Sequence, residues 1–301
     1  MVGVEQARLF GVLGDPVEHS CSPTMQNAAF AATGLPHLYL RYRVPAPALP
    51  VALAEARTIG MGGLNLTVPL KEAALPLVDA LSPDAERIGA INTIIFRPHG
   101  TLVGHNTDGA GFLAAVRGRA RVRGGSAVVI GAGGSARAVA IALHGAGCGA
   151  FLVANRTPAR AAALVRRLAS LGATRVAAIP LSALARGEVL DGATLVVNTT
   201  PLGLAGAPLA VRHRSAPPGC LFVDLVYGSR PTPFLAGAAA AGRPTLDGSA
   251  MLLHQGALAF EAWTGRHAPR AAMARALRAA GLVLTGLAPA ATFPRARPPL
   301  P

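Results

Sequence analysis

The chain has 301 residues, of which 51% are hydrophobic, and a formal net charge of +14. This length predicts about two domains, and the apolar residues form no uninterrupted run of about 20, so we expect no membrane partner. The N-terminus lacks the cationic start and the long apolar stretch of a signal peptide, which predicts a cytoplasmic protein. The three cysteines, Cys21, Cys148 and Cys220, are too widely spaced to suggest a metal site, and no metal is expected.

Most of the positive charge comes from scattered arginines. The one dense group comprises Arg117, Arg119, Arg121 and Arg123, and only 4% of the residues are aromatic. Nucleic-acid surfaces usually combine a basic stripe with aromatic stacking groups, so we expect no nucleic-acid partner. A positive field instead favours anionic small molecules, such as a carboxylate substrate and a phosphorylated cofactor.

The first part of the chain reads as strands alternating with helices. Strands are predicted over residues 9–13, 39–44 and 62–69. The third of these alternates in polarity and stops at its proline. A helix is expected to begin near Ser22-Pro23, with Ser22 as its cap, and helical spacing continues over residues 70–81.

A basic, glycine-rich linker over residues 117–125 precedes a second α/β pattern. Its first strand, 127–130, opens directly into glycines and an alanine-rich helix. Strand-like runs recur at residues 150–154, 195–198 and 221–226. Because helical stretches separate these runs, we expect a parallel sheet with helices on both faces.

The glycines after the first of these strands predict a dinucleotide site. The segment Gly131-Ala132-Gly133-Gly134-Ser135-Ala136 fits the pattern G-x-G-x-x-A between a strand and a helix. Missing side chains at such a turn let backbone N–H groups and the helix N-terminus approach a pyrophosphate.

The residues after the next strand indicate which nucleotide binds. An NAD site usually places Asp or Glu there to accept a hydrogen bond from the ribose 2′-hydroxyl. This chain instead has Asn155-Arg156-Thr157, followed by Arg160. A guanidinium can pair with a 2′-phosphate that a carboxylate would repel, so the sequence predicts NADP(H) as the cofactor.

Lysine usage singles out one residue. Of the 28 Lys and Arg residues, 27 are Arg, and the only lysine is Lys71. Arginine stays protonated at ordinary pH, whereas lysine can release and take up a proton in a partly desolvated site. Reduction of a ketone and oxidation of an alcohol both require such a proton transfer, so we expect Lys71 to be catalytic.

The segment Asn65-Leu66-Thr67-Val68-Pro69-Leu70-Lys71 resembles the N-x-T-x-P-x-K signature of the shikimate dehydrogenase family. Further segments resemble family motifs in the same order. They are HSCSP (19–23), GAINT (89–93), GHNTDG (104–109), NRT (155–157), DLVY (224–227) and MLLHQ (251–255). The resemblance extends from about residue 9 to residue 265, which is nearly the whole chain.

The resemblance implies roles for individual residues. Lys71 and Asp108 form the catalytic pair, and which of them carries the proton stays open. The substrate-binding residues are Ser20, Ser22, Asn65, Thr67, Asn92, Tyr227 and Gln255. Cofactor binding extends from the glycine-rich turn (Gly131, Ala132, Gly133, Gly134, Ser135) and the arginine segment (Asn155, Arg156, Thr157, Arg160) to Leu225, Gly248 and Met251. The chain departs from the family pattern at Gln26, where histidine is common, and at Ala250, where a second glycine is usual.

The resemblance also implies the architecture and the activity. We expect an α/β substrate-binding catalytic domain (1–115), an NADP-binding Rossmann domain (116–247), C-terminal helices that return to the first domain (248–285) and a disordered tail rich in Pro and Arg (286–301). The implied activity is NADPH-dependent, reversible reduction of 3-dehydroshikimate to shikimate in the pathway to chorismate and the aromatic amino acids. A quinate/shikimate or aminoshikimate dehydrogenase and a non-catalytic NADP-binding regulator are the alternatives, and a homodimer is left open.

Overall fold

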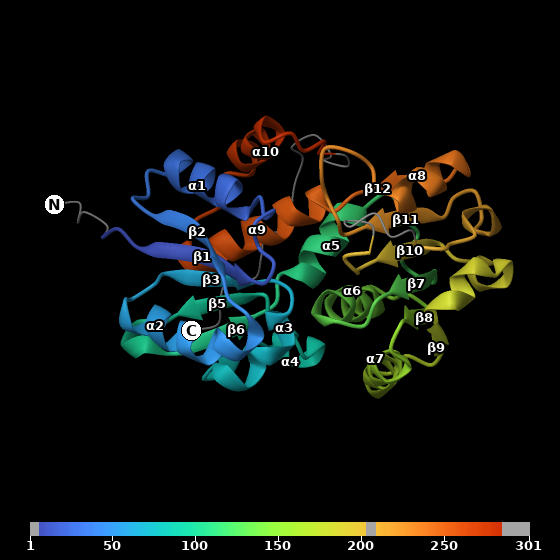
Figure 1. Cartoon of the computed structure of the whole chain (residues 1–301), viewed down its shortest axis with the longest axis horizontal. Helices are drawn as coiled ribbons and strands as arrows, with labels where there is room; N and C mark the ends of the chain where they lie inside the picture. The colour runs from blue at the N-terminus through green and yellow to red at the C-terminus, as the bar shows by residue number, and fades with distance from the viewer. Residues whose placement is uncertain (1–5, 203–208, 285–301) are drawn as a thin grey trace. The chain divides into compact units, whose positions relative to one another are not determined.

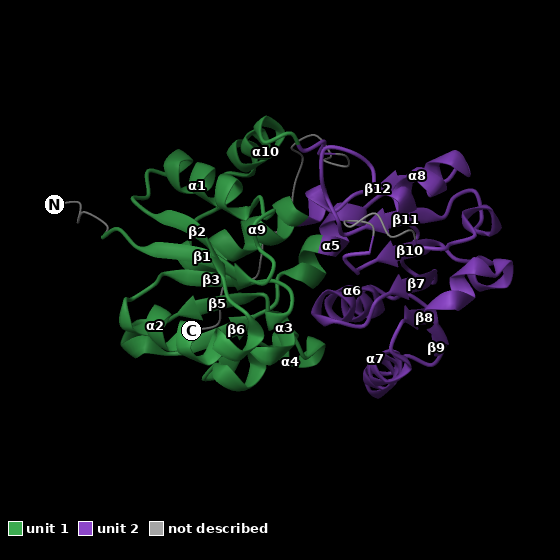
Figure 2. Ribbon diagram, viewed as in Figure 1, with its two compact units in different colours: residues 1–111, 252–281, 288–301 green, residues 112–251, 282–287 purple. Residues whose placement is uncertain are grey.

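The computed structural model describes residues 6–202 and 209–284 (Figure 1). The chain forms two compact units, coloured separately in Figure 2. Unit 1 comprises the chain up to Gly111 together with Leu252–Gly281, and unit 2 comprises Phe112–Met251 with residues 282–284. The tail expected over residues 286–301 lies outside the described residues. Within the described ranges, none of the helices has both the length and the apolar character that a bilayer span requires.

Unit 1 is built on a mixed six-stranded sheet. Its order is β2 (Leu38–Arg43), β1 (Leu9–Gly14), β3 (Gly63–Leu66), β5 (Thr93–Phe96), β6 (Leu102–His105) and β4 (Ala80–Leu81). All neighbouring pairs are parallel except those that β5 makes with β3 and β6. The carboxyl ends of β1, β2, β3 and β6 therefore lie at one edge of the sheet, which is also the edge where β5 begins.

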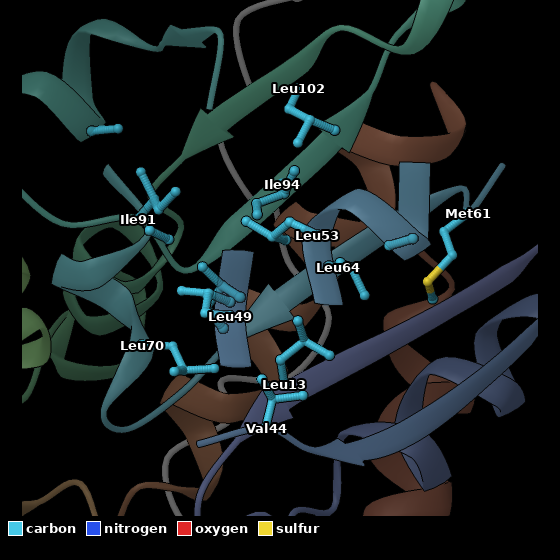
Figure 3. Close-up of a cluster of buried hydrophobic side chains, with 14 residues drawn as sticks. Leu13, Val44, Leu49, Leu53, Met61, Leu64, Leu70, Ile91, Ile94 and Leu102 are labelled. Carbon is cyan, nitrogen blue, oxygen red and sulfur yellow. The ribbon is translucent and has the colours of Figure 1, made fainter. Parts of the chain in front are cut away.

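Helices cover both faces of this sheet. They are α1 (Ser22–Ala32), α2 (Leu49–Thr58), α3 (Leu70–Ala73), α4 (Pro83–Ile88), α10 (Arg270–Ala279) and the unit 1 parts of α5 (Asp108–Val116), which ends in unit 2, and of α9 (Ser249–Thr264), which begins there. Figure 3 shows the core beneath α2 and α3, where Leu13, Leu49, Leu53, Leu64 and Leu70 are all at most 4% exposed.

The opposite face carries aromatic residues from α1 and α9. The Phe10 ring on β1 packs at a tilt against the rings of Phe30 and Trp263, whose centroids are 5.0 and 5.3 Å away. The Trp263 indole also donates to the Ile94 carbonyl at 3.0 Å. A Cβ on Gly63 would lie 2.2 Å from the Trp263 Nε1, so this glycine allows α9 to approach the sheet closely.

Helices α1 and α9 also approach each other closely. A Cβ on Gly256 would lie 2.1 Å from the Met25 Cε atom. Gln26, which departs from the family pattern, is fully buried at this crossing and donates from its amide to the Gly256 carbonyl at 2.9 Å. The departure therefore supplies a hydrogen bond between the two helices.

The strand expectations for unit 1 are confirmed at β1 and β2, but three details were wrong. The segment after Gly62 does not alternate, because all four residues of β3 are buried between two covered faces. The expected helix over residues 70–81 ends at Ala73, since Pro76 lacks the N–H group that a helix interior requires. Ser22 does not cap α1 but begins it, with Cys21 at the cap position.

Unit 2 is built on a fully parallel six-stranded sheet. Its order is β12 (Thr245–Leu246), β11 (Leu221–Asp224), β10 (Leu195–Asn198), β7 (Ser126–Ile130), β8 (Ala150–Asn155) and β9 (Val176–Pro180). The helices are α6 (Gly134–Gly145), α7 (Pro158–Ser170) and α8 (Pro233–Ala240). The expected parallel sheet is confirmed, and the chain changes direction across it between β7 and β10, where doubly wound folds bind ligands.

The sequence analysis did not anticipate the two edge strands of unit 2. The outer strand β9 is mostly exposed, and β12 has only two residues, so neither has the apolar run that marks an internal strand. Short 3₁₀ helices complete the chain at η1 (Ala46–Ala48), η2 (Leu75–Leu77), η3 (Pro98–Gly100), η4 (Leu181–Ala185), η5 (Gly187–Leu190) and η6 (His213–Ser215).

Candidate active site

Lys71 and Asp108 form an ion pair at the carboxyl-end edge of the unit 1 sheet. Lys71 lies in α3, just after β3, and Asp108 begins α5, just after β6. The Lys71 Nζ and Asp108 Oδ2 atoms are 2.5 Å apart, and the two side chains are only 13% and 6% exposed. The pair predicted from the sequence is therefore assembled within one unit, largely shielded from solvent.

Two asparagines fix the position of Asp108. The Asn92 amide donates to Asp108 Oδ1 at 2.7 Å, so each carboxylate oxygen has its own partner. The Asn106 Oδ1 atom accepts from the Asp108 backbone N–H at 3.0 Å, and the Asn106 amide donates to the Ala90 carbonyl at 2.9 Å. Asn106 thus ties the start of α5 to the segment that precedes β5.

Asn92 is itself held on every side. Its Oδ1 atom accepts from the Thr107 backbone N–H at 2.8 Å and from the Thr93 hydroxyl at 3.0 Å. Its amide also donates to the Thr107 hydroxyl at 3.0 Å, while Gln255 Oε1 from α9 lies 3.4 Å away. Both amide hydrogens are engaged within the protein, so the main role visible for Asn92 is to orient Asp108.

Asn65 extends this network toward β2. The buried Tyr39 hydroxyl donates to Asn65 Oδ1 at 2.7 Å. The Asn65 amide donates to the Asn92 carbonyl and to the Thr93 hydroxyl, both at 3.0 Å. Because both amide hydrogens are used, Asn65 can meet a substrate hydroxyl only as an acceptor, through the remaining lone pair of Oδ1.

The hydroxyl residues assigned to substrate lie on two segments of the same edge. Ser20 and the buried Ser22 follow β1, and the Ser20 hydroxyl accepts from the Ser22 backbone N–H at 3.3 Å. Thr67 follows β3, and a Cβ on Gly14 would lie 2.3 Å from its methyl group. The chain leaving β1 therefore passes directly against Thr67, and the absence of a side chain at Gly14 permits that contact.

The glycine-rich turn of unit 2 lies at the carboxyl end of β7. Gly131 has a φ of +112°, which disfavours other residues, and a Cβ there would lie 2.3 Å from the Thr199 hydroxyl. Gly133 is the N-cap of α6, and no side chain in the described part of the protein caps this helix. Its first-turn N–H groups therefore suit a pyrophosphate, beside the buried Ala132 and the half-buried Gly134 and Ser135.

The segment after β8 presents its cations to solvent. Asn155 ends the strand and donates from its amide to the Thr157 carbonyl at 3.0 Å, which forms a tight turn. Arg156, Thr157 and Arg160 are exposed, the last of them in the first turn of α7. The donor set fits a ribose 2′-phosphate, since the described turn has two guanidinium groups and no carboxylate.

The remaining assigned residues follow β11 and β12 in unit 2. Leu225 and Tyr227 are half-buried, whereas Gly248 and Met251 are buried. A Cβ on Gly248 would lie 2.1 Å from the Leu225 carbonyl oxygen, so a larger residue would displace the chain after β11. The close approach at this turn depends on Gly248, and Ala250 is accommodated with no exposed surface.

The structure adds several residues, to which the sequence analysis gave no role, to the hydrogen bonds and close contacts around the assigned residues. In unit 1 they are Tyr39, Thr93, Asn106 and Thr107, and in unit 2 they are Asn198, Thr199 and Asp224. Thr93, Asn106 and Thr107 lie inside the quoted GAINT and GHNTDG motifs, which was a usable signal. Tyr39 carried none, because its link to Asn65 joins residues 26 positions apart in the chain.

Asp224 is a fully buried carboxylate at the end of β11. Its oxygens accept from the Thr232 hydroxyl at 2.6 Å, from the Asn198 amide at 3.1 Å and from the Val226 backbone N–H at 3.1 Å. Burial raises the pKa of Asp224 to about 6, although these three hydrogen bonds oppose the rise. Asp224 thus fixes the loop that carries Leu225 and Tyr227.

Three family models match successive parts of the chain. They are the shikimate dehydrogenase substrate binding domain over residues 12–94, shikimate / quinate 5-dehydrogenase over residues 114–201 and the shikimate 5′-dehydrogenase C-terminal domain over residues 248–278. The first and third matches contain the assigned residues of unit 1 except Asp108, which lies between matched segments.

Individual relatives align over most of the chain. The shikimate dehydrogenase (NADP(+)) of Moorella thermoacetica is 46% identical over 278 residues, which cover 90% of this chain and 93% of the relative. The crystal structure of shikimate 5-dehydrogenase from Thermus thermophilus in complex with NADP(H) and shikimate is 42% identical, with a TM-score of 0.77 and coverage of 91% and 99%. Quinate dehydrogenase from Corynebacterium glutamicum in complex with NAD is 32% identical, with a TM-score of 0.80 and coverage of 91% and 100%.

The raised pKa of Asp224 predicts a pH-dependent stability. Since the folded-state pKa of about 6 exceeds the ordinary value of 3.8, the native state binds the extra proton between these values. Protonated Asp224 therefore makes its full contribution to the free energy of unfolding below about pH 4. This contribution, roughly 3 kcal/mol, is lost as the pH rises through 6. In urea unfolding at about pH 4.5 and about pH 7.5, we expect the wild type to lose free energy of unfolding at the higher pH. Asp224→Asn should not lose it, because its side chain does not titrate, and it should therefore gain stability relative to the wild type. If the two proteins differ in free energy of unfolding by the same amount at both pH values, the pKa of Asp224 is not raised.

Proposed function

Because the chain belongs to the shikimate dehydrogenase family, we propose that it catalyses the reversible reduction of 3-dehydroshikimate to shikimate with NADP(H) in the cytoplasm. The observation that carries the proposal is the shielded Lys71–Asp108 pair, which Asn92 holds in place. Unit 1 contains this pair and the proposed substrate residues other than Tyr227, and unit 2 contains the proposed dinucleotide residues.

Lys71 supplies the proton in this reaction. A protonated Lys71 has three N–H donors, and Asp108 engages one of them. We propose that the ammonium transfers one of its protons to the substrate oxygen that becomes a hydroxyl, as negative charge develops on that oxygen. In the oxidation direction the neutral Nζ accepts the proton from the hydroxyl. Asp108 holds the amine in position and offers Oδ2 as a second contact for the same hydroxyl.

We propose that neutral hydrogen-bonding groups orient the substrate. Ser20, Ser22 and Thr67 supply three hydroxyl donors, which suit the carboxylate of shikimate. Asn65 accepts from a ring hydroxyl, and Gln255 has a second amide hydrogen to donate, since its other bonds to the Leu252 carbonyl at 3.0 Å. The family resemblance adds Tyr227 to the proposed set.

The cofactor is proposed to bind along the carboxyl ends of β7 and β8. NADP(H) supplies or accepts the hydride when bound. The N-terminus of α6 holds the pyrophosphate, with Gly131, Ala132, Gly133, Gly134 and Ser135 contributing backbone groups. Arg156 and Arg160 pair with the 2′-phosphate beside Asn155 and Thr157, while Leu225, Gly248 and Met251 line the nicotinamide end.

Steady-state kinetics test the proposal directly. The purified protein would be assayed for oxidation of shikimate, quinate and aminoshikimate, each with NADP and with NAD, by the absorbance of the reduced nicotinamide. We expect the highest kcat/KM for shikimate with NADP. A higher value for quinate with NAD would transfer the protein to the quinate branch, and NADP binding without turnover would indicate a regulator.

Substitution of Lys71 tests its role as proton donor. We expect Lys71→Ala to lower kcat by about 10²- to 10⁴-fold, the usual contribution of a general acid–base group. Lys71→Arg serves as the matched control for charge, because it keeps a cation beside Asp108 but cannot release a proton near neutral pH. The kcat of Lys71→Arg should be nearly as low as that of Lys71→Ala. Turnover close to wild type in Lys71→Arg, with unchanged NADP affinity, would show that Lys71 acts only as a charge.

Substitution of Arg156 tests the cofactor preference. Arg156→Asp removes the proposed partner of the 2′-phosphate and adds a repelling charge, so we expect the Kd for NADP to rise about 10- to 100-fold. The Kd for NAD should change far less. Arg166→Asp, an exposed position on α7, makes the same charge change and controls for the general field. Equal weakening of NADP and NAD by Arg156→Asp would contradict the assignment.

A further inference from the structure

Arg41 lies on the face of the unit 1 sheet that carries the polar network of the site. It pairs in register with Val12 of β1, and Val12 pairs with Asn65 of β3. Side chains at one register level in parallel strands point to the same face. The Arg41 side chain therefore points to the same face of the sheet as Asn65. The two residues are two strands apart, which is roughly 10 Å, and Arg41 is exposed.

The Arg41 side chain contacts the serine loop that follows β1. Its Nε atom donates to the Ser20 carbonyl at 2.8 Å, and the Ser20 hydroxyl in turn accepts from the Ser22 N–H at 3.3 Å. Burial raises the pKa of the Cys21 thiol, and the positive charge of Arg41 opposes that rise. The hydrogen bond to the Ser20 carbonyl thus places the guanidinium charge beside residues 20–22.

No carboxylate of the described residues neutralises Arg41. Arg43, two residues further along β2, pairs with Asp15 at 2.8 Å and lies 3.9 Å from Glu18. Arg57 pairs with Asp79 at 2.9 Å. Arg41 forms no ion pair at all within residues 6–202 and 209–284, so its charge is available to an anion from outside the chain.

We propose that Arg41 is a specificity-determining residue that pairs with the substrate carboxylate held by the Ser20 and Ser22 hydroxyls. This inference rests on the proposed function. The two terminal nitrogens of the guanidinium group are bonded to its central carbon and lie further along the side chain than Nε. The proposal places a carboxylate on the Ser20 hydroxyl within ion-pair range of these nitrogens, roughly 4–6 Å. The serine and threonine hydroxyls are neutral, so Arg41 would be the cation of this subsite.

A contact with the carboxylate is distant from the reacting carbon and equal in the ground and transition states. Its loss should therefore raise KM and leave kcat unchanged. The contact should also discriminate between charged and neutral forms of one substrate. A guanidinium stabilises the acid by charge–charge attraction, whereas it offers a methyl ester only hydrogen bonds.

The test compares oxidation of shikimate and of shikimate methyl ester with NADP. For Arg41→Gln, which keeps an N–H donor for the Ser20 carbonyl, we expect kcat/KM for the acid to fall about 5- to 20-fold, mostly in KM. The ester should change less than about 2-fold, because only the charge has been removed. Equal losses for acid and ester would mean that Arg41 merely positions the loop, and would overturn the proposal.

Two variants control the comparison. Arg41→Lys keeps the charge and should retain most of the preference for the acid over the ester. Arg43→Gln removes a cation from the same strand whose charge Asp15 already neutralises, and it should leave that preference unchanged. If Arg43→Gln loses as much preference for the acid over the ester as Arg41→Gln, the preference comes from the overall positive charge of the strand. The proposed pairing of Arg41 with the carboxylate would then be wrong. If the wild-type protein oxidises neither compound, the proposed function itself fails.

Discussion

The candidate site depends on keeping a lysine and an aspartate together in a nearly dry environment. Removing each charge from water costs several kcal/mol, and contact between the charges recovers that cost only when the geometry is good and the remaining lone pairs are satisfied. Lys71 and Asp108 meet at 2.5 Å, and Asn92 occupies the second carboxylate oxygen. The ends of β3 and β6 and the start of β5 must therefore stay in register for the pair to exist.

The two units use one structural rule for different chemistry. In both sheets the polar residues follow the carboxyl ends of parallel strands, where the backbone turns and side chains converge. In unit 1, side-chain hydrogen bonds link the polar residues at that edge to one another. The hydroxyl of Thr93 and the amide of Asn65, for example, have partners within the protein. Unit 2 leaves the N-terminus of α6 without a side-chain cap in the described part of the chain. One arrangement suits a proton transfer, and the other suits a phosphate group.

Much of this was readable from the sequence, because it depends on residue type and local spacing. The parallel sheet of unit 2 followed from apolar runs separated by helical stretches, and the glycine-rich turn followed from its place after such a run. The single lysine among 27 arginines marked Lys71, since lysine alone of the two can exchange a proton near neutral pH. The family resemblance then paired Asp108 with Lys71 and added Asn92 to the site, and unit 1 of the structure brings these three residues together.

Tertiary structure decided what local spacing could not encode. Helical periodicity over residues 70–81 gave way to a short helix and an edge strand, because Pro76 and pairing with β6 outweighed it. The link from Tyr39 to Asn65, and the contact from Arg41 to Ser20, join residues more than 20 positions apart. The sequence determined which chemical groups are present and which local turns carry them. Long-range packing determined which of those groups are already engaged within the protein, since hydrogen-bond partners across strands depend on register.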